Sequence, residues 1–366
     1  MTPRLVLENV RHQPMRSLLS ALLIGVPVTL ILTLVGLSHG MLEDAADRTR
    51  GIRADIIVRP KNSSLVSMRN GIPEDFVKYF ARKPHVKAAV GVLMQPVEGI
   101  TMMMTGIDMP AYNAMNGGFR YVAGTPPQSP DDIVIDEYYA RQKKARVGSR
   151  LKILNHSWRV AGIIENGQMA HIVANLKMLQ DLLSAHGDVN TIYLKLDNSA
   201  NTEEVEHELT SDPRLEDWPI LSTEEMASAW SIDNMPGLKP FIYVVMGIGV
   251  VIGFFVVCLS MYMAVLQRTR EIGILKSLGA SKAFILQIIL AEAFLLGLAG
   301  TIAGVVLSFG SYYLIGTLVP ASIQMKIVPV WWPIAGGITM IGAILGALYP
   351  GMRAAAADPI EALAYE

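Results

Sequence analysis

The residues that could carry out chemistry in this chain are few, and their spacing fits no common catalytic site. Two acidic pairs, Asp131-Asp132 and Glu203-Glu204, could act as paired carboxylates, but we expect both to be solvated helix or turn residues. The seven histidines are scattered, and none belongs to an H-E-x-x-H zinc motif. The phosphate-binding pattern G-x-x-x-x-G-K-[ST] is absent. We therefore expect no catalysis, no metal and no cofactor in this chain, and no ATP hydrolysis by it.

Cysteine usage and net charge restrict the function further. Cys258 is the only cysteine, so no disulfide can form within the chain, and its place in an apolar segment is typical of a structural thiol. The chain has 31 basic and 32 acidic residues. This near-neutral balance gives no reason to expect nucleic-acid binding.

An excess of apolar residues excludes an ordinary soluble domain. Hydrophobic residues make up 51% of the chain and charged residues only 17%. Long segments with little or no charge account for this excess, and about 20 residues of helix span the hydrocarbon core of a bilayer. We predict four transmembrane helices, near residues 18–37, 241–266, 284–315 and 331–349. The third is longer than a bilayer requires, so it is expected to be tilted or broken.

The distribution of basic residues predicts how these helices cross the membrane. The first segment is longer than the apolar core of a signal peptide, and residues 38–41 offer no A-x-A-like cleavage site, so it should remain as an anchor. The loop between the third and fourth helices has only Lys326 as a basic residue. The positive-inside rule therefore places both termini and the loop 268–282 in the cytoplasm. The basic residues on that side are Arg4, Arg11, Arg16, Arg268, Arg270, Lys276, Lys282 and Arg353.

Residues 41–239 are polar, mixed in charge and long enough to form an extracytoplasmic domain between the first two helices. Arg48, Arg50 and Arg53 lie at its start, where charge has less influence on topology because the translocated segment is long. Short alternating runs predict strands, and Pro73 followed by acidic residues predicts a helix start. Intermixed strands and helices indicate the α+β class. The strands are expected at 54–58, 133–135, 147–153, 158–163 and 191–196, and the helices after residue 73, at 136–141 and at 201–209.

Pairs of glycines spaced four residues apart occur in the last three apolar segments. Such spacing lets helix backbones approach closely where lipid provides no hydrophobic drive. We favour general helix packing, and the alternative is that one pair lines a seam between two copies that slides during transport. The pairs are Gly249 and Gly253, Gly300 and Gly304, and Gly342 and Gly346.

Glu292 is the only ionisable residue clearly inside a predicted spanning segment. A carboxylate in the membrane is expensive, so it usually faces a partner or water. A proton relay would need further acids or histidines in the other helices, and the sequence has none there. We therefore favour a buried hydrogen bond within the helix bundle or across a dimer over ion coupling.

A short charged segment, residues 270–281 (REIGILKSLGAS), separates the second and third apolar segments. Glu271 suits the positive end of a short helix, Gly279 can stop that helix, and Ser281 can cap the next one. The three-residue spacing of Ile272, Leu275 and Leu278 predicts one apolar side. The segment should form a rigid knob that a partner holds in a groove. The alternative is an interfacial loop that lies on lipid.

This segment resembles the loop that couples MacB/FtsX-type ABC transporter permeases to their ATPase subunit. The resemblance covers nearly the whole chain. Residues 5–11 resemble the cytoplasmic elbow of these permeases, and residues 134–137, 147–149 and 159–163 resemble their periplasmic core domain. Residues 350–355 and 358–363 resemble the usual ending of the family. The residues implied in ATPase coupling are Arg270, Glu271, Ile272, Gly273, Leu275, Lys276, Leu278 and Gly279.

The resemblance implies a four-helix membrane protein with an inserted α+β domain. The expected divisions are an elbow and first helix at 1–40, the extracytoplasmic domain at 41–239, and the remaining helices at 240–366 with the coupling loop at 267–283. It implies the permease subunit of an ABC transporter in the bacterial inner membrane. Its implied partners are an ABC ATPase subunit that binds ATP and Mg²⁺, a second permease copy as a homodimer or heterodimer, membrane lipids and a membrane-fusion adaptor.

The family leaves several roles open for the extracytoplasmic domain. Its members are known as exporters, lipoprotein extractors and signal transmitters. We expect ATP-driven motion to be passed to this domain for export or extraction of a lipid-like, peptide or lipoprotein client. The alternatives are a cargo-free mechanotransmitter that regulates a cell-wall hydrolase, and a membrane-anchored receptor.

Overall fold

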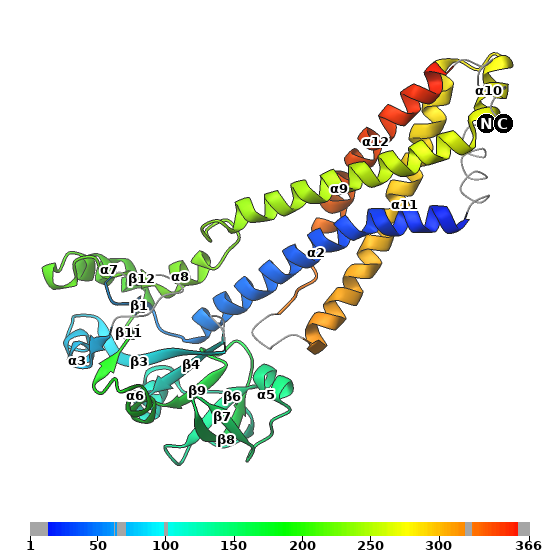
Figure 1. Ribbon diagram of the computed structural model, residues 1–366. Coiled ribbons are helices and arrows are strands. Elements are labelled where there is room, and N and C mark those ends of the chain that lie inside the picture. The colour runs from blue at the N-terminus through cyan, green and yellow to red at the C-terminus, as the bar shows by residue number, and fades with distance from the viewer. Residues whose placement is uncertain (1–13, 62, 64–70, 99–101, 319–323, 358–366) are drawn as a thin grey trace. The chain divides into compact units, whose positions relative to one another are not determined.

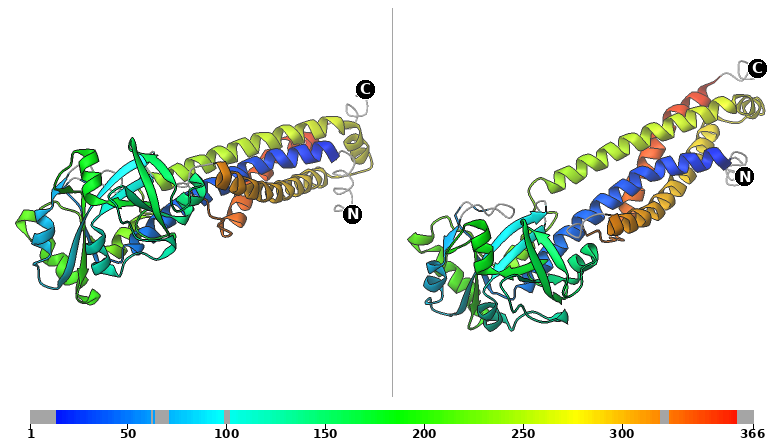
Figure 2. Two further views of the ribbon diagram at one scale, coloured as in Figure 1. Left: turned by 90° about the horizontal axis from the view of Figure 1, so that it is seen from below. Right: turned by 60° about the horizontal axis from the view of Figure 1, so that its bottom comes forward.

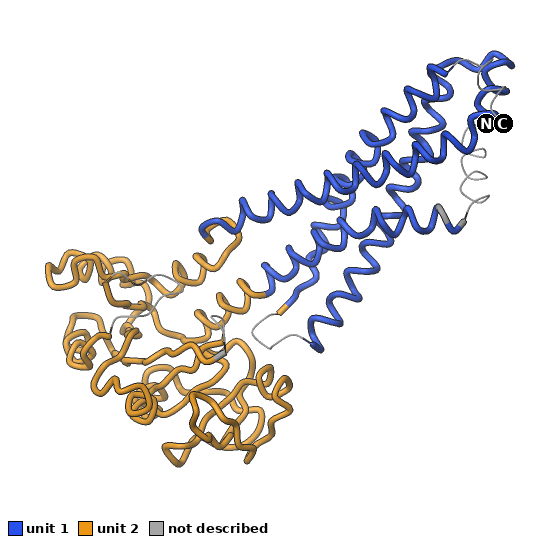
Figure 3. The backbone as a smooth tube through the Cα atoms, in the orientation of Figure 1, with its two compact units in different colours: residues 1–40, 236–319, 325–366 blue, residues 41–235, 320–324 orange. Residues whose placement is uncertain are grey.

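The computed structural model describes residues 14–61, 63, 71–98, 102–318 and 324–357. It divides the chain into two compact units, shown in Figure 3. The helical unit comprises residues 1–40, 236–319 and 325–366, and the α/β unit comprises residues 41–235 and 320–324. The predicted elbow at 5–11 and the tail at 358–363 lie outside the described residues.

Long helices build the helical unit, and the two views in Figure 2 show them side by side. They are α2 (Pro14–Gly51), which contributes residues to both units, α9 (Leu238–Gln267), α11 (Lys282–Leu318) and α12 (Trp331–Ala356). Among the described residues, these four are long and apolar enough to cross a membrane, which confirms the predicted number of transmembrane helices. The third is an uninterrupted helix of 37 residues. A short helix, α10 (Thr269–Ser277), lies between α9 and α11.

Glycines on α11 allow close contact with α2. A Cβ atom added at Gly300 would lie 2.5 Å from Cγ2 of Ile24, and one at Gly304 would lie 2.7 Å from the backbone oxygen of Gly25. The hydroxyl of Thr29 also donates to the Gly304 carbonyl across 3.1 Å. Because backbone atoms cannot move aside as flexible side chains do, Gly304 requires glycine, and a side chain at Gly300 would have to displace Ile24.

The other two glycine pairs also lie inside the helical unit. A Cβ atom at Gly346 of α12 would lie 2.6 Å from the backbone oxygen of Phe254 in α9, whereas Gly342 makes only ordinary contacts with α9. A Cβ atom added at Gly249 would lie 3.5 Å from the Cβ atom of Pro27 in α2. Gly253 is buried, and no atom lies within 4 Å of a Cβ atom added there. The observed close approaches are thus between helices of one chain, as general packing requires.

The α/β unit is built on a mixed sheet (Figure 1). Its described strands follow the order β12-β1-β11-β3-β4-β9-β6-β8-β5, and β7 pairs with β8. The pairs β4–β9 and β6–β8 are parallel, and the other pairs in this sheet are antiparallel. The strands are β1 (Ile56–Val58), β3 (Val86–Glu98), β4 (Met102–Ile107), β5 (Tyr121–Gly124), β6 (Asp132–Asp136), β7 (Arg150–Ile153), β8 (His156–Ile164), β9 (Ile172–Asn175), β11 (Thr191–Leu196) and β12 (Ile220–Ser222).

Helices are interspersed with these strands, which confirms the α+β class. A separate pair of short strands, β2 (Ile72–Pro73) and β10 (Asp188–Val189), is antiparallel. The helices are α3 (Asp75–Phe80), α4 (Met109–Asn116), α5 (Glu137–Lys143), α6 (Leu176–Leu183), α7 (Thr202–Thr210) and α8 (Thr223–Ala229), with short 3₁₀ turns at Ser199–Asn201 and Pro213–Leu215.

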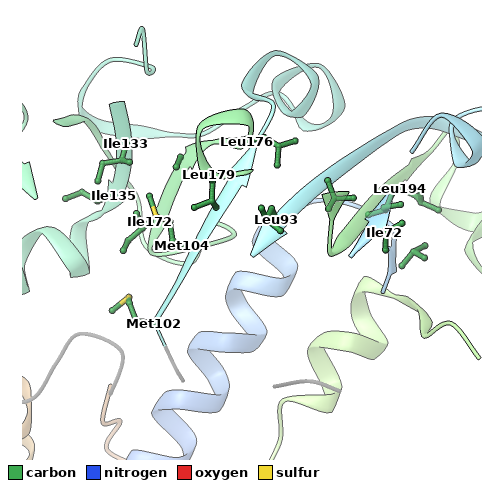
Figure 4. Close-up of a cluster of buried hydrophobic side chains, with 14 of the residues drawn as sticks. Ile72, Leu93, Met102, Met104, Ile133, Ile135, Ile172, Leu176, Leu179 and Leu194 are labelled. Atoms are coloured by element: carbon green, nitrogen blue, oxygen red, sulfur yellow. The ribbon is translucent and has the colours of Figure 1, made fainter. Parts of the chain in front are cut away.

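Apolar side chains fill both faces of the sheet. Successive residues of a strand point to opposite faces, so Ile133 and Ile135 join one buried cluster while Val134 joins the other. Figure 4 shows members of the first cluster, among them Met104 and Ile172 from the parallel pair β4–β9. A sheet covered on both faces in this way gives the α/β unit a core of its own.

Asp136 is the centre of a buried polar cluster in the α/β unit. Its carboxylate caps α5 by accepting from the backbone N–H of Tyr139 at 2.7 Å. It also accepts from Arg48 Nη2 at 2.8 Å and from His171 Nδ1 at 2.9 Å. Burial raises the pKa of this carboxyl, but the His171 hydrogen bond and the Arg48 charge outweigh burial, so the pKa of Asp136 lies below its ordinary value.

Replacing Gly304 by alanine should destabilise the helical unit, because the new methyl group meets the α2 backbone. We expect a loss of about 1–3 kcal/mol, the usual cost of overpacking. The matched control is Gly310→Ala on the same helix, where an added Cβ meets no atom within 4 Å. Thermal aggregation of the detergent-solubilised chain measures both variants. Equal melting temperatures for the two would contradict this packing.

Asp136→Asn should destabilise the α/β unit at neutral pH by about 1–3 kcal/mol, because it removes one of the two carboxylates, Asp44 and Asp136, that hold the buried Arg48 charge. The stabilisation by Asp136 is complete above the ordinary pKa of aspartate, about 4, and is lost as the pH falls through the lower folded-state pKa. The difference in unfolding free energy between the wild type and the variant should therefore become smaller below about pH 4. Thermal unfolding followed by tryptophan fluorescence between pH 3 and pH 7 measures this difference. The control is Asp131→Asn, at an exposed position. A difference that does not change with pH would disprove the role of the carboxylate.

Candidate functional site

Helix α10 occupies the segment that the sequence singled out, and its ends are sharply defined. Gly279 follows it with φ +95°, a left-handed conformation that favours glycine. The backbone N–H of Ala280 bonds back to the carbonyl of Leu275 at 3.0 Å. The hydroxyl of Ser281 then accepts from the N–H of Phe284 at 3.2 Å, in the first turn of α11. Since every residue of this connection is hydrogen-bonded or turned, α10 is held as a rigid helix.

The apolar residues of α10 lie on two faces, which differs from the predicted single side. Ile272 and Leu275 pack inward against the buried cluster of the helical unit, and Gly273 is buried. Ile274 and Leu278 face outward, with 44% and 80% of their surface exposed. The reason is the helical period, because residues four apart share a face more closely than residues six apart.

Charged residues surround this outward face. Arg270 and Glu271 are exposed, and Glu271 lies in the first turn of α10, where a negative charge suits the helix dipole. Ile274 was not among the residues chosen from the sequence. Its four-residue spacing from Leu278 is the signal that would have found it.

Lys276 fastens the C-terminal half of α10 to the end of α12. Its ammonium group donates to the backbone carbonyl of Ala355 at 2.9 Å and to the carbonyl of Ala357. The last carbonyls of a helix have no partner within that helix, and a cation is favourable beside them. Lys276 therefore connects α10 to α12 rather than forming part of the exposed face.

Arg268 fastens the other end of α10 to α11. Its Nη1 atom donates to Oε2 of Glu292 at 3.3 Å, and the two side chains are 17% and 11% exposed. Glu292 thus has a partner in the same chain, in the bundle interior. Ser20 and Ser260 are hydrogen-bonded to each other at 2.7 Å and line a small polar pocket beside this ion pair.

A cavity of about 90 Å³ lies between α9, α10 and α11. Apolar side chains such as Met261 and Ile289 line it, and Arg268 and Glu292 stand at its polar side. The packing beneath α10 is therefore incomplete. Polar contacts at the two ends of the helix and the packing of Ile272 and Leu275 together hold it in place.

This arrangement is suited to binding rather than to catalysis. It presents an exposed apolar pair, Ile274 and Leu278, with charged neighbours on a fixed helix, which is the form of a helix-in-groove contact. Within the described parts of the chain, no group of three or more His, Cys, Asp or Glu side chains is placed to hold a metal ion.

Two family models match the chain. Residues 17–212 match the MacB-like periplasmic core domain, and residues 243–359 match the FtsX-like permease C-terminal domain. The first match spans more than half of the 366 residues and contains the strands of the α/β unit up to β11. The second contains α10, α11 and α12 and nearly all of α9.

Relatives with this architecture are ABC transporter permeases by name. The uncharacterized ABC transporter permease YknZ of Bacillus subtilis is 25% identical over 99% of this chain and 98% of its own length. The macrolide export ATP-binding/permease protein MacB of Marinobacter nauticus is 24% identical over 96% of this chain but only 58% of its own length. A crystal structure of the periplasmic region of MacB from Actinobacillus actinomycetemcomitans covers 51% of this chain at 12% identity, with a TM-score of 0.37. On the two family models, the chain belongs to the MacB/FtsX-type ABC transporter permeases.

Proposed function

We propose that a separate ABC ATPase subunit binds α10 of this permease. The permease would then transmit the ATP-driven motion of that subunit to the α/β unit. The main support for this proposal is the exposed apolar pair Ile274 and Leu278 on α10. Hydrogen bonds attach this helix to its neighbours at both ends. Large apolar side chains gain about 1.5–3 kcal/mol each when a partner buries them fully. Such a pair on a preformed helix is suited to a groove on the ATPase.

Transmission follows from the two fastenings of α10. A displacement of α10 would pull on Glu292 of α11 through Arg268, and on the end of α12 through Lys276. The cavity under α10 shows that the packing there is incomplete, which would make a small shift of the helix less costly. Motion would then pass along α11 and α12 as rigid elements, because helices that touch through backbone cannot slide freely.

The proposed setting is the bacterial cytoplasmic membrane. Both termini and α10 would face the cytoplasm, because the basic residues next to the helices concentrate on that side. The α/β unit would lie outside and act on a lipid-like, peptide or lipoprotein client during export or extraction. A second permease copy would complete the membrane part, and the ATPase subunits would bind ATP and Mg²⁺.

Leu278→Asp should weaken assembly with the ATPase without affecting the fold, because the side chain is 80% exposed. Loss of a central anchor costs about 2 kcal/mol, which corresponds to roughly 30-fold in affinity. Glu271→Lys, which reverses a neighbouring exposed charge, should weaken assembly less. Titration of the purified permease in nanodiscs with its ATPase subunit measures both affinities.

The control for Leu278→Asp is Val122→Asp, at a valine of the α/β unit that is 54% exposed. It should leave the affinity for the ATPase unchanged. If Leu278→Asp binds the ATPase as wild type does, the exposed pair on α10 is not the contact with the ATPase and the proposal is wrong.

The Arg268–Glu292 pair should behave as one unit in a double-mutant cycle. Arg268→Gln or Glu292→Gln alone removes one charge of this ion pair, and breaking a buried pair in this way typically costs about 3–5 kcal/mol. Both variants should also lower ATP hydrolysis stimulated by the permease. The double neutral variant should lose much less stability than the sum of the single losses. Additive losses in melting temperature would show that the two groups do not interact.

A further inference from the structure

A groove runs between α9 and α12 on a part of the helical unit that does not touch α10. Its volume is about 290 Å³. Phe255, Leu259 and Tyr349 on its walls are more than half exposed, so the groove is open along its length. It is lined by Phe255, Cys258, Leu259 and Tyr262 of α9 and by Tyr349 and Arg353 of α12.

One end of the groove is cationic and aromatic. The guanidinium of Arg353 lies 5.6 Å from the ring centre of Tyr262, and Nη1 donates to the hydroxyl of that tyrosine at 3.4 Å. In the described part of the chain, no carboxylate forms an ion pair with Arg353. Tyrosine and arginine at the end of a spanning helix are typical of the headgroup level of a bilayer.

The rest of the groove is apolar and runs toward the middle of the membrane. Phe255 lies seven residues before Tyr262 on α9, which is about 10 Å along the helix. A free phosphate or another small soluble anion would use only the arginine and leave these walls exposed. An amphiphile with an anionic head and an acyl chain uses both parts.

We propose that this groove binds an anionic phospholipid. The phosphate accepts from the guanidinium of Arg353, whose fork of donors matches phosphate oxygens, and an acyl chain lies along Leu259 and Phe255. The site rests on the bilayer placement of the helices, and only its assignment to the cytoplasmic leaflet rests on the proposed orientation.

The position of Arg353 connects this lipid to α10. Lys276 of α10 donates to the carbonyl of Ala355, two residues after Arg353 in the last turn of α12. The lipid phosphate and α10 therefore hold the same helix end. A bound anionic lipid therefore stabilises the end of α12 to which α10 is attached.

The test compares phosphatidylglycerol with phosphatidylcholine of identical acyl chains, bound to the purified full chain and counted by native mass spectrometry. The chain should retain phosphatidylglycerol more strongly. Arg353→Gln should weaken its retention about fivefold, the effect of one cation near a lipid headgroup. Arg353→Lys should keep part of the binding, because lysine retains the charge but not the fork of donors. Leu259→Trp should also weaken it, because the indole fills the groove while Arg353 remains.

The matched control is Lys282→Gln, an exposed cation at the start of α11 that does not line the groove, and it should bind the lipid as wild type does. If Lys282→Gln and Arg353→Gln weaken the retention of phosphatidylglycerol equally, the effect comes from general surface charge and the proposed site is wrong. Unchanged retention in Arg353→Gln would overturn it as well. Efficient oxidation of Cys258 to a disulfide between two copies would show that a second permease covers the groove. None of these readouts involves the ATPase, so they are independent of the role of α10.

Discussion

Helix α10 is fastened to the membrane helices by two cationic side chains, Arg268 at its start and Lys276 near its end. Each cation has partners on another helix, the carboxylate of Glu292 and the last carbonyls of α12. A charge without a partner in or near hydrocarbon is expensive, so these contacts resist separation. The apolar packing below α10 involves Ile272 and Leu275 and leaves a cavity. The proposed transmission of force depends on these two fastenings.

Close packing of backbones holds the helices of the helical unit together, which suits the proposed transmission of motion. Gly300 and Gly304 bring α11 against α2, and Gly346 brings α12 against α9. In a membrane, where apolar side chains gain nothing by leaving lipid, such contacts supply van der Waals attraction that bulkier residues would prevent. Helix α2 continues without interruption to Gly51, and in the α/β unit its Arg48 is bonded to Asp136.

Much of this fold could be predicted from the sequence because its signals are local. Charge-free runs predicted the four long helices, and alternation predicted β11 and the pair β7 and β8. The strands β3 and β4 were missed. Gly91 and Pro96 interrupt the first, and the methionine-rich second has no alternating pattern. The parallel pairing of β4 with β9 joins segments that lie far apart in the chain, and no local pattern indicates it.

The candidate site was located by its sequence, but its contacts were not. The segment 270–281 indicated a short helix with defined ends, and α10 lies there. The partner of Glu292 could not be identified because Arg268 is 24 residues away and meets it only once α10 folds back. Lys276 was among the residues implied in ATPase coupling, and its contact with the end of α12, 79 residues away along the chain, was not foreseen. Both contacts depend on tertiary packing rather than on helical period.

The central claim is that α10 is the surface that the ATPase grips. The most direct measurement places a photo-crosslinking amino acid at position 278 and irradiates the permease in membranes together with its ATPase subunit. The account predicts a strong crosslink between permease and ATPase from position 278, and none from position 122 in the α/β unit. Crosslinks from position 278 to lipid alone, in membranes where the assembled complex is present, would contradict it.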